Sequence, residues 1–87
     1  MSRPEVGYAY LGDGVGLTFT HRGHKLLVYT RDFGLTPHLV LRGEWERAIE
    51  EAVLRQTPVG GTVVEVGCNM GYHTLAMSEK LGVNGKL

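Results

Sequence analysis

Apolar and polar residues alternate along the first third of the chain, which is the pattern of strands that bury one face. Residues 15–20 read VGLTFT, and residues 25–30 form a second run rich in apolar and aromatic side chains. Residues 12–14, GDG, favour a tight turn back to a short strand at residues 8–11. The pattern therefore predicts a small antiparallel β unit, in which residues 21–24 connect the two longer strands.

After this unit the sequence predicts two helices. Thr36 is suited to an N-cap and Pro37 to the first helical residue. Gly43 is suited to the stop, so a short helix is predicted over residues 38–42. Residues 44–56 give the clearest helical pattern, with one apolar face and Arg–Glu pairs four residues apart on the other face. The apolar face is predicted to consist of Trp45, Ala48, Ile49, Ala52 and Val53.

The run VVEV at residues 63–66 is followed by a glycine turn and a further helix. Valines on both faces of the pleat predict a buried strand inside a parallel sheet. Gly67 and Gly71 bracket the turn, where the absence of a Cβ lets the backbone approach a bound molecule. A helix is predicted from about residue 70 to residue 81, with Gly82 as its C-terminal cap. Its free N–H groups would point at the ligand.

The order of residues in this turn discriminates between cofactors. A dinucleotide-binding turn normally reads G-x-G-x-x-G, whereas Glu65 to Gly71 reads E-x-G-x-N-x-G, with Asn69 in place of a middle glycine. The turn contains no basic residue, and the phosphate-loop ending G-K-[ST] is absent from the chain. An acidic residue before a turn without cations suits a ligand that carries an ammonium group and ribose hydroxyls, such as S-adenosylmethionine.

At these residues the chain resembles a known family, the FkbM-type S-adenosylmethionine-dependent methyltransferases. The run EVGCNMGY at residues 65–72, with Thr74, is similar to the first cofactor motif of that family, and residues 43–46, GEWE, are similar to its G-x-aromatic-E. Glu and Cys at the first and fourth places of the run stand where Asp and Ala are commoner. The resemblance spans about residues 11–87 and implies the α/β, Rossmann-like fold of class I methyltransferases.

The resemblance also implies a function and roles for residues. The intact protein would transfer a methyl group from S-adenosylmethionine to a hydroxyl oxygen of a sugar or another small metabolite. Glu65 would interact with the methionine ammonium, while Gly67 and Gly71 would permit close approach of the backbone. Tyr72 and Thr74 fit a role in lining the pocket and a role in capping the helix equally. These positions identify no general base. The implied cofactor-binding residues are Glu65, Gly67, Cys68, Asn69, Met70, Gly71, Tyr72 and Thr74.

The chain has 87 residues, whereas a typical Rossmann-like domain needs about 150 or more. We therefore expect a truncated class I methyltransferase fold preceded by a small antiparallel β unit. It would be an N-terminal fragment of a larger enzyme and inactive alone. The expected domains are residues 1–43 for the β-rich unit and residues 44–87 for the start of the cofactor-binding domain. The acidic residue that holds the ribose in this family would lie beyond the sequence.

Composition narrows the class of partner and compartment. Lys+Arg and Asp+Glu number 9 each, so the charge balance does not indicate nucleic acid or an acidic membrane as a partner. No apolar run is long enough to span a bilayer. The single cysteine cannot form an internal disulfide, which favours a reducing, cytoplasmic compartment. The expected partner is a small-molecule acceptor, no metal is expected, and the oligomeric state is not indicated.

Other interpretations of the same residues stay open. The turn could be a plain strand-to-helix connection, or part of a nucleotide-binding oxidoreductase, which the missing middle glycine disfavours. The valine strand could instead be the edge of a non-catalytic assembly or interaction module that pairs with another subunit. Cys68 fits a small buried residue better than a nucleophile. His21 and His24 fit a solvated hairpin better than a pair of metal ligands.

Overall fold

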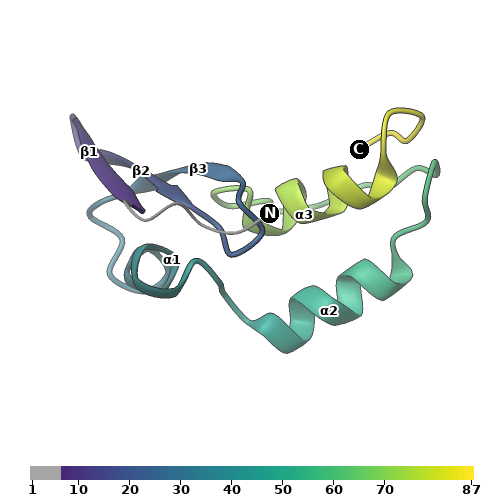
Figure 1. Ribbon diagram of the computed structural model, residues 1–87, viewed down its shortest axis with the longest axis horizontal. Helices are drawn as coiled ribbons and strands as arrows, with labels where there is room; N and C mark the ends of the chain where they lie inside the picture. Colours follow the sequence, from purple (N-terminus) through teal and green to yellow (C-terminus); the bar gives the residue numbers. More distant parts are fainter. Residues whose placement is uncertain (1–6) are drawn as a thin grey trace. The chain divides into compact units, whose positions relative to one another are not determined.

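The computed structural model describes residues 7–87, so residues 1–6 of the first predicted domain lie outside the described part. Within it, the chain forms two compact units that meet in the sequence between Trp45 and Glu46. Together they make a small α/β protein (Figure 1). Its elements are β1 (Tyr8–Gly12), β2 (Val15–Phe19), β3 (Lys25–Tyr29), α1 (Thr36–Arg42), α2 (Arg47–Gln56) and α3 (Tyr72–Leu81).

The predicted antiparallel β unit is confirmed. The sheet has the order β1-β2-β3, and both pairs of neighbours are antiparallel. The register places Tyr8 opposite Thr18 and Val15 opposite Tyr29. The first turn follows from the GDG sequence, because Asp13 has a φ of 55° and Gly14 a φ of 76°, values that Gly and Asp tolerate best.

The buried face of this sheet is the face that carries the smaller and more polar residues of β2. Thr18 is fully buried, and its Oγ1 donates to the carbonyl of Gly7 at 2.8 Å, so the hydroxyl is satisfied. Leu26 and Val28 share this face, and α1 packs against the sheet (Figure 1) and contains the fully buried Leu39. The opposite face is more open to solvent: its residues include the exposed Leu27 and Tyr29 and the half-buried Val15, Leu17 and Phe19.

Helix α1 confirms the predicted short helix, with a different N-terminal cap. The N-cap is Leu35 rather than Thr36, whose Oγ1 donates instead to the carbonyl of Tyr29 at 2.7 Å. Asp32 orders the loop that leads into the helix, because its Oδ1 accepts the N–H groups of Leu35 and Gly34, both at 2.9 Å. These hydrogen bonds, that from Leu35 first, lower the pKa of Asp32 below its ordinary value of 3.8. Thr36 was therefore wrong as the cap.

Helix α2 begins later than predicted. It starts at Arg47 rather than residue 44, because Glu46 has a left-handed φ of 47° that interrupts the helical backbone. Trp45 consequently lies outside the helix and contacts the ring of His38, with 5.1 Å between ring centroids. The end of the helix at Gln56 agrees with the prediction.

The predicted apolar face of α2 is wrong in its first turn. Ala48 is exposed and Ile49 is 49% exposed, whereas Glu50 is only 1% exposed. Ala52 and Val53 are half-buried. Glu50 is buried because α3 lies beside α2 and Tyr72 of α3 donates a hydrogen bond to it, which offsets the cost of burying a carboxylate.

The second unit consists of α2 and α3, which pack side by side, together with the segments that flank α3 (Figure 1). Helix α3 starts at Tyr72, two residues later than predicted, and has Gly82 as its C-cap with a φ of 75°, as expected. Ala76, Met77 and Leu81 bury its inner face. Among the helices of residues 7–87, none combines the length and the apolar content needed to cross a bilayer.

The buried strand predicted at residues 63–66 is not formed. Thr62 makes an isolated parallel bridge with Lys86, and the N–H of Val63 donates to the carbonyl of Lys86 at 2.9 Å. Val64 and Val66, however, are 85% and 92% exposed. A valine-rich segment becomes a buried strand only where neighbours cover its faces and edges. Within the described residues, pairing stops at Lys86, so the Rossmann-like sheet stays a prediction.

Candidate functional site

The turn between Glu65 and α3 contains most of the residues predicted to bind a cofactor. Three of its residues have left-handed φ values: Gly67 at 71°, Asn69 at 52° and Gly71 at 90°. The N–H of Gly71 donates to the carbonyl of Cys68 at 2.9 Å, and the carbonyl of Gly71 accepts the N–H of Leu75 at 3.0 Å. The second of these bonds joins the turn directly to the first turn of α3.

The backbone around Gly67 is open. A Cβ added to Gly67 would meet no atom within 4 Å, whereas a Cβ on Gly71 would lie 3.9 Å from the Thr74 side chain. Gly67 itself, Cys68 and Asn69 are exposed. A ligand can therefore reach this backbone directly, which is the property predicted for Gly67. The positive φ, rather than crowding by the chain, is what makes glycine the favourable residue there.

The carboxylate of Glu65 lies against the first turn of α3. The Oγ1 of Thr74 donates a hydrogen bond to Oε1 of Glu65, and both residues are half-buried. This bond brings together two of the predicted site residues from opposite ends of the turn. It orients the carboxylate through one oxygen, and the second oxygen has lone pairs available to accept a donor from a ligand.

Tyr72 is held away from the open side of the turn. Its side chain is 5% exposed, and its hydroxyl donates to Oε1 of Glu50 on α2. The sequence did not single out Glu50. A weak signal exists, since Glu50, Val53, Leu54 and Thr57 share one helical face at i, i+3, i+4 and i+7, and all four are buried or half-buried. A carboxylate is rarely buried on the inner face of a helix unless it is paired.

The remaining site residues lie along the turn. Cys68 is a free, exposed cysteine, so its interpretation as a small buried residue is wrong. Met70 and Gly71 are half-buried. His73, the neighbour of Tyr72, has a buried Nδ1 without a hydrogen-bond partner, and its ring packs edge-on to that of Tyr72 with 5.2 Å between centroids.

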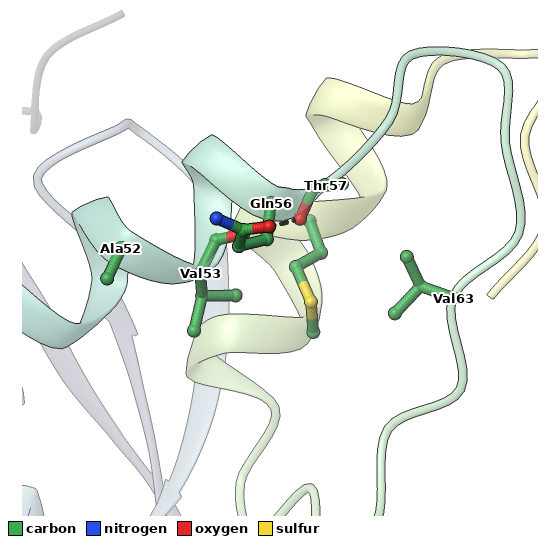
Figure 2. Close-up of a pocket in the computed structure, with 6 residues that line it drawn as sticks. Ala52, Val53, Gln56, Thr57 and Val63 are labelled. Carbon is green, nitrogen blue, oxygen red and sulfur yellow. Dashed lines mark hydrogen bonds between the residues drawn. The ribbon is translucent and has the colours of Figure 1, made fainter.

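A separate apolar pocket of about 370 Å³ lies within the second unit, away from the turn (Figure 2). Val63 faces α2 across it, and Thr57 closes the helix end by donating from Oγ1 to the carbonyl of Val53 at 2.8 Å. None of the predicted cofactor residues lines it. The lining residues are Ala52, Val53, Gln56, Thr57, Val63 and Met77.

Neither a metal centre nor a known relative adds to this picture. In the part of the chain that the structure describes, which includes His21 and His24, no three His, Cys, Asp or Glu side chains are grouped to hold a metal ion. Comparisons of the chain with protein families, curated proteins and solved structures found no match.

Proposed function

We propose that the second unit carries the cofactor turn of an S-adenosylmethionine-dependent methyltransferase of the FkbM type. The enzyme would act in the cytoplasm and methylate a hydroxyl oxygen of a sugar or another small metabolite. The observation that carries the proposal is the hydrogen bond from Thr74 to Glu65 across a turn that contains three residues with left-handed φ values. That arrangement sets an oriented carboxylate next to an open stretch of backbone.

The chemistry of the turn fits this cofactor. The carboxylate of Glu65 suits the methionine ammonium, because a charge-assisted hydrogen bond of this kind is among the stronger ones in proteins. The exposed backbone at Gly67 suits the close approach of a nucleoside. The turn holds no cation that would favour a phosphate. When bound, S-adenosylmethionine supplies a methyl group on a sulfonium, and the chain's part is to hold the ligand in place.

The fold also supports the proposal at one point. Thr62 and Lys86 pair in parallel, and the chain between them contains α3. Parallel neighbours joined through a helix are the connectivity of a βαβ unit, from which Rossmann-like sheets are built. The bridge is a single pair, so it supports the connectivity and leaves the extent of the sheet as part of the proposal.

The test is an NMR titration of the isotope-labelled protein with S-adenosylmethionine. We expect amide shifts confined to residues 65–74, with a Kd weaker than about 10 μM, or about −7 kcal/mol, because the turn is open and covers little of a ligand. Glu65→Gln keeps the size of the side chain and removes its charge, so affinity should fall by about 1.5–3 kcal/mol. Glu51→Gln, at an exposed position on α2, is the matched control.

Two further ligands sharpen the result. 5′-Methylthioadenosine lacks the amino acid, so Glu65→Gln should not change its binding. NAD⁺ carries a pyrophosphate and should leave the turn unshifted. Equal shifts with NAD⁺ would favour the oxidoreductase alternative, and no shift with S-adenosylmethionine at millimolar concentration would remove the proposal.

A second candidate function is an assembly module, favoured by the exposure of Val64 and Val66 beside the Thr62–Lys86 bridge. In this case a second copy of the chain would pair with the segment. Light scattering after size-exclusion chromatography would show a dimer that Val64→Lys dissociates. Val83→Lys, at a fully exposed position in the same unit, is the control and should leave the dimer intact.

A further inference from the structure

A buried carboxylate outside the turn is the feature that the proposed function does not use. Glu50 is 1% exposed in α2, although burial of a carboxylate costs free energy unless hydrogen bonds compensate for it. Tyr72, itself buried, donates its hydroxyl to Glu50. Replacement of both partners of a buried hydrogen bond by apolar groups of the same shape can be nearly neutral or stabilising, so stability alone does not explain the pair.

The pair lies directly at one end of the candidate turn. Tyr72 is the first residue of α3 and follows Gly71, whose N–H and carbonyl both take part in hydrogen bonds of the turn. At the other end, Thr74 holds Glu65. Between these two ends, Gly67, Cys68 and Asn69 are exposed; Gly67 and Asn69 have left-handed φ values, and a Cβ on Gly67 would meet no atom within 4 Å. Order in the turn therefore depends on its ends.

We infer that Glu50 is a positioning residue for the turn, acting through Tyr72. By fixing the first residue of α3, it keeps Gly71 and Asn69 in their left-handed conformations before any ligand arrives. Glu50 itself does not touch the ligand. This inference rests on the proposed function only in taking the turn as the ligand site. A turn that is ordered in advance lowers the entropic cost of binding a ligand.

Amide hydrogen exchange in the absence of ligand tests this inference. The reporters are the N–H group of Gly71, bonded to Cys68 within the turn, and that of Leu75, bonded to the carbonyl of Gly71. The references are the N–H groups of Gly60 and Val63, which are bonded to Leu81 and Lys86 elsewhere in the same unit. Tyr72→Phe removes only the hydroxyl, and we expect exchange at the two reporters to rise by about tenfold while the references change less than about twofold.

Matched variants separate positioning from general stability. Glu50→Gln keeps an acceptor oxygen for Tyr72, whereas Glu50→Ala does not. Exchange rates at the two reporters should therefore rise less in Glu50→Gln than in Glu50→Ala. Tyr29→Phe and Glu51→Gln change exposed side chains of the same kinds and should leave the reporters unchanged. Circular dichroism at the temperature of the experiment establishes that each variant is folded.

A uniform rise at reporters and references would assign Glu50 to general stability and overturn the inference. No change at the reporters in Tyr72→Phe would overturn it as well. The titration with S-adenosylmethionine tests the proposed function separately. If the protein does not respond to this ligand but exchange at the reporters still rises in Tyr72→Phe, the proposed cofactor is rejected and the coupling of Glu50 to the turn is retained.

Discussion

The two units use hydrogen bonds in different ways. In the first unit, β2 pairs with a strand on each side, and buried Thr18 bonds to the backbone. In the second unit, Thr62 pairs with Lys86 in a single bridge, and side chains connect α3 to α2 and to the turn. These connections are Tyr72 to Glu50, Thr74 to Glu65, and the Nζ of Lys80 to the carbonyl of Leu54.

This difference indicates where each unit is sensitive to substitution. A backbone ladder is insensitive to most side chains, so the first unit should depend mainly on what packs against its covered face. The second unit should depend on single polar atoms, because loss of one partner leaves another buried group without its hydrogen bond. The same dependence makes the second unit better suited to a site whose geometry responds to a ligand.

The largest expected effect is in the first unit. Leu39 is fully buried on α1, which packs against the sheet, so Leu39→Ala should cost about 2–5 kcal/mol through lost burial and the cavity it leaves. Urea unfolding followed by the fluorescence of Trp45, the single tryptophan and part of this unit, measures the change. Leu41→Ala, 78% exposed on the same helix, should change stability by less than about 0.5 kcal/mol. Equal effects of both variants would contradict the packing described for α1.

A smaller effect is expected in the second unit from one atom. Tyr72→Phe removes the hydroxyl that donates a hydrogen bond to Glu50. The free energy of unfolding should fall by about 1–3 kcal/mol, because the carboxylate stays buried. The helical signal in circular dichroism during urea unfolding reports the loss. Tyr29→Phe, at an exposed tyrosine of the sheet, should be neutral within about 0.5 kcal/mol. A neutral Tyr72→Phe would mean that the second unit does not depend on single polar atoms.

The same difference explains which features the sequence could predict. The strands from Tyr8 to Tyr29 are neighbours in the chain, and the turn residues between them are diagnostic, so a local pattern was sufficient. Glu50 was missed because its burial depends on Tyr72, 22 residues later. Residues 63–66 satisfy every local criterion for a buried strand, yet burial depends on partners that no local pattern contains. Gly67 and Gly71 were predictable because a left-handed turn limits the residue type.

The candidate turn should respond to backbone rather than packing changes. Gly67→Val places a β-branched residue at a φ of 71°, which should cost about 1–2 kcal/mol although no atom lies within 4 Å of the new Cβ. It should also abolish ligand binding, since the side chain fills the open side of the turn, and in the intact enzyme it should abolish methyl transfer. Gly67→Asn, which tolerates this φ, should cost less. Thermal unfolding and the ligand titration measure both effects, and equal costs for Val and Asn would show that φ is not the cause.

The smallest expected effect returns to the first unit and depends on pH. Asp32 accepts the N–H groups of Leu35 and Gly34, which lower its pKa below 3.8 in the folded protein. The stabilisation is therefore fully present above pH 3.8 and is lost as pH falls through the lower folded-state pKa. Asp32→Asn keeps an acceptor oxygen but does not titrate, so it should flatten the stability profile below pH 3.8. Acid unfolding followed by Trp45 fluorescence, with Asp13→Asn as the control, measures the difference. An unchanged acid profile in Asp32→Asn would show that the loop before α1 does not depend on this charge.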